Sequence, residues 1–283
     1  MKFSERIGIQ TIKVEIQSDY IDDDLLNSLW SLFDMYFASP LKSQDSNYYQ
    51  ATKFKKFIEN LWFSFFKEPI DTIPRNSYDV IRNIRDRFFS FYWYQVYDFI
   101  EFIAKNPDPI DGKQFTNACN FVLGRELSAF RFIENELTPI TDENQIEQIQ
   151  KAIDDTATNK LKSVNTHLQA SLNKLSDKMK PDYRNSIKES ISAVESLAQI
   201  ISGDKKAELG KALKIIKDKI GLHTALEQGF SKLYGYTSDS DGIRHSLSEE
   251  STLDLEDAIY MLTSCSAFIN YLIIKSDKSG IKL

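Results

Sequence analysis

Glycine and proline, the residues that most often interrupt helices, are scarce in this chain. They number 10 and 7, about 6 % of the 283 residues, against roughly 12 % in an average protein. Their shortage disfavours a turn-rich all-β fold and long disordered stretches. Apolar residues recur at steps of three and four along most of the sequence, which is the spacing of a helix face that packs into a core. The sequence therefore predicts an all-α protein.

Aromatic residues divide the chain into two parts. Residues 1–135 hold 28 of the Phe, Trp and Tyr residues, and residues 136–283 hold 7. Cores of such different composition indicate two helical domains, each of ordinary size. We expect an aromatic-rich N-terminal domain over residues 1–140 and a second helical bundle over residues 141–283.

Periodicity and capping signals predict the helices of both domains. In the first half they are expected over residues 22–40, 48–66, 77–105 and 113–136. In the second half, apolar stripes predict helices over residues 161–175, 205–220 and 223–233. Two capping-box patterns, at Ser186/Glu189 and Ser251/Asp254, predict the starts of two further helices, of which the first ends at Gly203.

Composition excludes several kinds of chemistry. The chain has no glycine-rich phosphate loop, and its three His and two Cys are too dispersed for a zinc cluster. The loop over residues 237–242 resembles a calcium loop, but Thr237 and Ser248 stand where carboxylates are required. We therefore expect no metal and no cofactor.

The same composition bears on location and partners. The net charge of −6 gives no overall attraction for polyanions, so nucleic-acid binding would need a local basic patch. Cys119 and Cys265 lie in apolar helical patterns without paired spacing, which indicates reduced core thiols. Without a signal-peptide pattern or a long apolar run, a cytoplasmic protein that avoids membranes is expected.

One segment combines side chains suited to chemistry: Asp241-Gly242-Ile243-Arg244-His245. An imidazole titrates near neutral pH and can move a proton, while a guanidinium can pair with phosphate oxygens. Together they could cleave a phosphodiester without metal, helped by a second histidine from a partner chain. The alternative is structural: Arg244 pairs with a nearby carboxylate, and His245 caps a helix or packs under the loop.

Three stretches of the second half, and the opening of the chain, resemble known proteins. The stretches YRNSIKESISAVES (183–196), KAELGKALKIIKDKIGLHTALEQGFSKLYGYTSDSDGIRHSL (206–247) and LEDAIYMLTSCSAFINYLI (255–273) resemble the HEPN superfamily. More narrowly, they resemble the C-terminal half of bacterial abortive-infection proteins. The opening MKFSERIGI, with DDDLLNSLW at 22–30, is similar to the N-terminal domain of the J-type abortive-infection group. The similar stretches together span most of the chain.

The resemblance implies a compact helical bundle that dimerises and often acts as a metal-independent endoribonuclease in phage defence or toxin–antitoxin systems. The usual HEPN motif is an arginine followed by four to six residues and a histidine. His245 matches the histidine, but Ser238, Asp239 and Ser240 stand where the arginine would be. Arg244 is the nearest candidate to replace it, with Asp241 or Glu189 orienting the pair.

Two further basic clusters bear on RNA. Lysines crowd the predicted helix over 205–220, and Lys211, Lys214 and Lys217 are candidate phosphate contacts. Arg75, Arg82, Arg85 and Arg87 precede a ring-rich run, where exposed rings could stack on bases. The plainer interpretations are a solvated helix face for the lysines and, for the arginines, a mostly buried set of rings with partners in Asp79 and Asp86.

Two functions follow. The first is a phage-defence protein whose C-terminal HEPN-like homodimer cleaves RNA, with the N-terminal domain sensing a phage trigger or restraining the nuclease, and with an antitoxin as a further partner. The second is a catalytically silent HEPN-like dimer that serves as a binding or scaffold protein in the same kind of system. The sequence discriminates between the two only through the missing upstream arginine, which favours the second.

Overall fold

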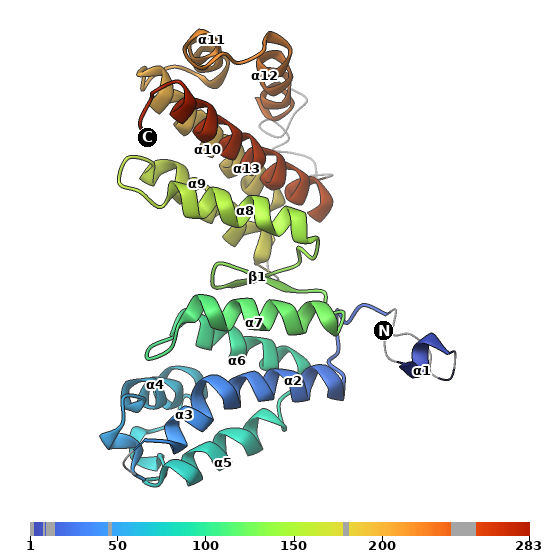
Figure 1. Cartoon of the computed structure of the whole chain (residues 1–283), viewed down its shortest axis with the longest axis vertical. Helices are drawn as coiled ribbons and strands as arrows, with labels where there is room; N and C mark the ends of the chain where they lie inside the picture. The colour runs from blue at the N-terminus through green and yellow to red at the C-terminus, as the bar shows by residue number, and fades with distance from the viewer. Residues whose placement is uncertain (1–2, 8, 10–14, 45–46, 178–180, 239–252) are drawn as a thin grey trace, which may run out of the picture. The chain divides into compact units, whose positions relative to one another are not determined.

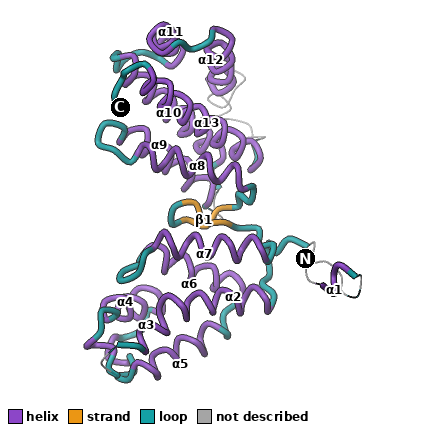
Figure 2. Tube along the Cα trace, viewed as in Figure 1, coloured by secondary structure: helices purple, strands orange, loops and turns teal. Residues whose placement is uncertain are grey.

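The structure is a computed structural model that describes residues 3–7, 9, 15–44, 47–177, 181–238 and 253–283. The chain divides into two compact units, unit 1 over Met1–Thr141 and unit 2 over Asp142–Leu283. Both are mostly helical (Figure 1). In the described part of the chain, the named strands form one short hairpin, drawn in orange in Figure 2.

Unit 1 is built from short helices followed by the hairpin. Its first long helix starts where the sequence predicts, because Asp22 accepts a hydrogen bond from the backbone N–H of Leu25 and acidic residues fill the first turn. The α-helices are α1 (Phe3–Arg6), α2 (Asp23–Phe33), α3 (Ser39–Lys42), α4 (Lys55–Asn60), α5 (Ser77–Phe88), α6 (Trp93–Lys105) and α7 (Gly112–Arg125). Wider π-type turns occupy Asp34–Ala38 and Leu61–Phe66, short 3₁₀ turns occupy Tyr49–Ala51 and Ile70–Thr72, and the strands are β1 (Arg131–Ile133) and β2 (Glu136–Thr138).

Several expected helices of unit 1 have different limits. The helix expected over 22–40 continues past Pro40 to Lys42, because the proline lies in the first turn of α3, where its missing N–H is tolerated. The helix expected over 48–66 starts only at Lys55, and the one expected over 77–105 is broken between α5 and α6.

The helix expected over 113–136 is wrong beyond Arg125. Leu127 adopts a left-handed backbone conformation, with φ of 58°, which ends α7. The chain then forms the hairpin, in which Phe132 faces Leu137 and Glu134 occupies the turn with φ of 54°. The all-α prediction therefore holds for the class but omits this hairpin.

The aromatic rings of unit 1 are mostly core, as expected. Phe33, Phe37, Phe88, Phe99 and Phe115 are at most 2 % exposed. Their rings contact one another at centroid distances of 5.3–6.0 Å, including Phe33 with Phe99 and Phe37 with Phe115. Such ring pairs add a directional contribution to the hydrophobic burial. The aromatic content thus has a structural explanation for most of its members, and the exposed rings stand out against it.

Unit 2 is a bundle in which α10 packs against α9, α11 and α13 (Figure 1). The heptad-like stripe of α9 is buried as predicted, with Leu168, Leu172 and Leu175 at most 2 % exposed. Gly203 ends α10 with φ of 80°, also as predicted. The helices are α8 (Glu143–Thr156), α9 (Lys162–Ser176), α10 (Tyr183–Ser202), α11 (Leu209–Ile220), α12 (Thr224–Ser238) and α13 (Leu255–Lys278).

Both predicted capping boxes of unit 2 are displaced. Helix α10 begins after Asp182, whose carboxylate accepts from the backbone N–H of Asn185, so Ser186 lies inside the helix. Helix α13 begins after Asp254, which forms a capping box with Asp257. The predicted cap Ser251 lies outside the described residues.

Helix α13 is the most apolar helix of unit 2. Its 24 residues include a window of mean hydropathy 1.4, long and apolar enough by composition to cross a membrane, but half of that window is buried inside the protein. The helix packs against α8 and α10, and Leu262, Cys265 and Ile269 are among its buried residues. The structure thus shows α13 as a core helix of unit 2.

Candidate functional site

The predicted catalytic pair lies in a segment bracketed by two described helices. Asp241, Arg244 and His245 fall within residues 239–252, outside the described residues. The described chain stops at the end of α12 and resumes before Asp254, the cap of α13. Their roles therefore stay predictions.

Glu189, the predicted supporting carboxylate, contacts a different histidine. It lies on α10, and its Oε2 is 2.7 Å from Nδ1 of His167 on α9. The two side chains are 24 % and 36 % exposed, so the pair lies at the edge of the bundle rather than in its core. When Nδ1 carries the proton and donates to the carboxylate, Nε2 of His167 is left as a proton acceptor. The structure therefore contains a carboxylate-oriented imidazole, which is a chemically competent group.

Three buried serines hold this pair in register. Ser171 Oγ is 2.7 Å from Ser190 Oγ and 3.0 Å from Ser186 Oγ, and it donates to the backbone carbonyl of Ser186 at 2.8 Å. Ser186 Oγ donates in return to the carbonyl of Ser171 at 2.9 Å. The small serine side chains let α9 and α10 approach closely. The hydrogen bonds among the three serines satisfy hydroxyl groups that are fully buried. Since Ser171 lies one turn beyond His167, the cluster fixes His167 opposite Glu189.

Some lysines of the helix α11 form contacts that stabilise the fold. Lys211 Nζ lies 3.0 Å from Asp204 Oδ2, and its hydrogen bond is the main cause that lowers the pKa of Asp204. Lys219 donates to the backbone carbonyl of Ser202 at 2.6 Å, where it satisfies the end of α10. Lys214 is exposed and Lys217 half-buried, and neither makes an ion pair with another described residue. Of the three predicted phosphate contacts, Lys214 and Lys217 thus keep free ammonium groups within the described chain.

Metal-binding clusters and reactive thiols are other chemical groups that could form a site among the described residues, whose cysteines are Cys119 and Cys265. No cluster of three or more His, Cys, Asp or Glu that could hold a metal ion occurs among the residues that the structure describes. Cys119 and Cys265 are free and buried. Burial raises the pKa of both thiols, that of Cys265 to about 12. Neither thiol is therefore a nucleophile in this conformation.

The sequence did not point to His167. The partner of Glu189 is 22 residues upstream and on another helix, so no local spacing connects the two. The available signal was that the two residues lie on helices that are consecutive in the predicted order, each close to an apolar stripe. That signal does not select this pair among the many polar residues with the same placement.

Comparison with known families identifies the N-terminal part. The family model described as AbiJ N-terminal domain 4 matches residues 1–155, which is more than half of the 283 residues. The chain belongs to this family. The match covers unit 1 and nearly all of α8, the first helix of unit 2. An AbiJ domain suggests a protein of an abortive-infection system.

The other comparisons add no relative. Neither the curated proteins nor the solved structures include a significant match to this chain.

Proposed function

We propose that this protein is a phage-defence factor of the abortive-infection type whose unit 2 is a HEPN-like, metal-independent endoribonuclease. The observation that carries the proposal is the AbiJ family match over residues 1–155. The nuclease part is supported by the HEPN resemblance of three stretches that fall on α10, on α11 and α12, and on α13. These helices pack into one bundle around α10, as a single domain requires.

The proposed reaction is an internal transesterification. His245 removes the proton from an RNA 2′-hydroxyl, whose oxygen attacks the adjacent phosphorus. The bond from phosphorus to the 5′-oxygen breaks, and a proton supplied by the acid partner, His245 of a second copy, leaves a 5′-hydroxyl. Arg244 pairs with the phosphate oxygens as charge builds on them. The products are a 2′,3′-cyclic phosphate and a 5′-hydroxyl, with Asp241 or Glu189 orienting the pair and Lys214 and Lys217 holding flanking phosphates.

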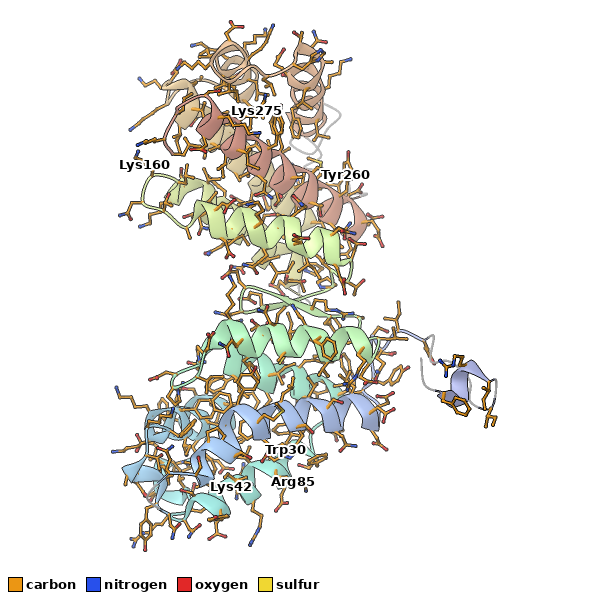
Figure 3. The ribbon with its side chains drawn as sticks, in the orientation of Figure 1. Trp30, Lys42, Arg85, Lys160, Tyr260 and Lys275 are labelled. Atoms are coloured by element: carbon orange, nitrogen blue, oxygen red, sulfur yellow. The ribbon has the colours of Figure 1, made fainter. Side chains whose placement is uncertain are left out.

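A homodimer through unit 2 is part of this proposal. Helix α13 carries a face formed by Tyr260, Ser264, Ala267, Tyr271 and Ile274, which recur at steps of four and three. Tyr260 is 59 % and Ile274 is 45 % exposed, and Figure 3 labels Tyr260 on α13. The five residues are uncharged, with small side chains at the centre, and the nearby Lys275 ammonium lies 6.0 Å from the ring centroid of Tyr271. Such a face suits a close helix–helix contact between copies.

Sedimentation measures this dimer directly. We expect the 32.7 kDa chain to sediment as a dimer, and Ala267→Arg to sediment as a monomer, because an arginine at the centre of the face would be buried without a partner. Phe63→Arg, at an exposed ring of unit 1, is the matched control and should remain dimeric. A monomeric wild type, or a dimeric Ala267→Arg, would contradict the assignment.

The rival function is a silent HEPN-like binding or scaffold protein. The absence of arginine at positions 238–240 favours it, as does the engagement of Glu189 by His167. In both functions unit 1 senses a phage product or restrains unit 2, an antitoxin is a further candidate partner, and the protein acts in the cytoplasm.

End-group mapping of cellular RNA separates the two functions. Bacteria that express the full chain are challenged with phage, and the ends of newly cleaved RNA are mapped. The nuclease proposal expects new 2′,3′-cyclic phosphate and 5′-hydroxyl ends in the strain with the protein and none in the strain without it. Undegraded RNA during effective defence would favour the scaffold function, and 5′-phosphate ends would exclude the 2′-hydroxyl mechanism.

A further inference from the structure

One face of α5 brings arginines and aromatic rings together at the edge of the core. Tyr78, Arg82, Arg85 and Phe89 step by four, three and four residues, so they project from one side of the helix. The first three are exposed, and Phe89 is half-buried. Trp30 of α2 lies beside Arg85, as Figure 3 shows. These five residues are called the α5 stripe below.

Arg85 is the central cation of the stripe. Its guanidinium lies 4.6 Å from the ring centroid of Phe89 and 5.8 Å from that of Trp30. Resting on two rings holds the side chain in place, and Arg85 makes no ion pair with any residue that the structure describes. A guanidinium that is positioned but unpaired keeps its N–H donors for a phosphate.

The neighbouring arginines differ in their availability. Arg82 pairs with Asp79 at 3.6 Å, but both side chains are more than half exposed, so the pair is weak and exchangeable. Arg87, off the stripe, is bound at both terminal nitrogens by Glu68, at 2.8 and 2.9 Å. The structure therefore leaves Arg82 and Arg85 as available cations on the stripe and commits Arg87 to the fold.

Two exposed tyrosines follow the stripe in the chain. Tyr92 and Tyr94, at the start of α6, are 69 % and 47 % exposed. Their rings are nearly parallel, with 5.8 Å between centroids and 10° between planes. In a unit whose other rings are mostly buried, a stacked and solvated pair offers flat surfaces on which a planar group can stack.

We propose that the α5 stripe, together with Tyr92 and Tyr94, binds single-stranded nucleic acid. Cations that no strong ion pair holds, and rings that reach solvent, are the two components that hold such strands, the cations on phosphates and the rings on bases. A duplex hides the faces of its bases, so it would gain only the phosphate contacts. Because the chain is acidic overall, binding depends on these local contacts. This surface belongs to unit 1 and does not depend on the nuclease proposal for unit 2.

Fluorescence anisotropy with labelled oligonucleotides of about 12 nucleotides tests the surface on the full chain. Single-stranded DNA, single-stranded RNA and an RNA duplex are compared. DNA lacks the 2′-hydroxyl that the proposed cleavage requires, so its binding is measured without interference from catalysis. We expect both single strands to bind more tightly than the duplex, and the better of the two to indicate the natural ligand.

Substitutions locate the binding. We expect Arg85→Ala and the double change Tyr92→Ala/Tyr94→Ala each to weaken binding about tenfold, and Arg85→Lys, which keeps only the charge, to lie between Arg85→Ala and wild type. The control is Arg125→Ala, since Arg125 also lies over an exposed ring, Phe121 at 6.0 Å, but is bound by Glu126. It should bind as wild type does.

Three results would overturn the proposal. The first is that no single strand binds. The second is that the Arg85 variants and the Tyr92→Ala/Tyr94→Ala variant bind as wild type does. The third is that Arg125→Ala weakens binding as much as they do. Circular dichroism shows whether each variant is folded. If Arg85→Ala does not fold, Arg85→Gln is measured in its place. If cells that express the protein show no RNA cleavage, while the purified protein binds single-stranded DNA, the nuclease proposal is rejected and the proposal for this surface stands.

Discussion

Substitution of His245 by alanine is expected to abolish RNA decay during phage challenge. Proton transfer by a positioned side chain contributes roughly 100- to 10,000-fold to a rate, and alanine cannot transfer a proton. Cells that express the variant should keep intact RNA and lose protection, while the protein accumulates to the wild-type level. RNA integrity and plaque counts are measured in the same cultures. Arg244→Ala is expected to have the same effect as His245→Ala, because the negative charge on the phosphate oxygens would lose its cationic partner.

His223 provides a matched control in the same unit. It is exposed, and its Nδ1 accepts a hydrogen bond from the backbone N–H of Ala225 at 3.2 Å, near the start of α12. His223→Asn removes an imidazole but keeps a side-chain acceptor at this position, so activity should be unchanged. Equal decay in wild type and His245→Ala would reject His245. Decay that is lost in His167→Asn but kept in His245→Ala would transfer the acid–base role to the Glu189–His167 pair.

The sequence predicted those elements whose signals are local and periodic. Leu168, Leu172 and Leu175 recur at the helical period, and they are buried on α9. A capping pattern is less specific than a stripe, which explains the error at Ser186. Asp182, four residues earlier, follows Pro181 and provides an equally good cap, and nothing in the local sequence decides between them.

Breaks that depend on tertiary packing were not predictable. The chain between α5 and α6 has no glycine or proline, so its ring-rich sequence resembles one continuous helix. There, Phe91 turns into the ring cluster, 6.0 Å from Phe99 and 6.2 Å from Phe88, and that contact requires the helix to stop. The hairpin was missed for a related reason, because Glu134 occupies a turn position with positive φ where glycine or asparagine is the usual signal.

The candidate site was predictable only in its residue types. A histidine beside an arginine in DGIRH has a recognisable chemistry wherever it occurs in a sequence. The partner of Glu189 is not recognisable in this way, because His167 reaches it across the contact between α9 and α10. Likewise, the sequence named Arg82, Arg85 and Arg87 together, and only their contacts separate the unpaired Arg85 from the Glu68-bound Arg87.

Replacing Phe99 with alanine is expected to lower the free energy of unfolding of unit 1 by about 3–5 kcal/mol. Phe99 is fully buried, and its ring lies 5.3–6.0 Å from those of Phe33, Phe65, Phe88 and Phe91. The loss combines the transfer of the ring from water with the cavity that remains. Rings are rigid and cannot bend into the space, so the cavity should persist, which places the cost in the upper part of this range.

Tryptophan fluorescence during urea unfolding isolates this effect. All three tryptophans, Trp30, Trp62 and Trp93, lie in unit 1, so the signal reports on that unit even if unit 2 unfolds separately. Phe121→Ala removes the same atoms from a ring that is 70 % exposed and should change the free energy by no more than about 0.5 kcal/mol. A loss below about 1 kcal/mol in Phe99→Ala would mean that the surrounding rings shift to fill the space. The aromatic core would then be adaptable rather than close-packed, and its richness in rings would need another explanation.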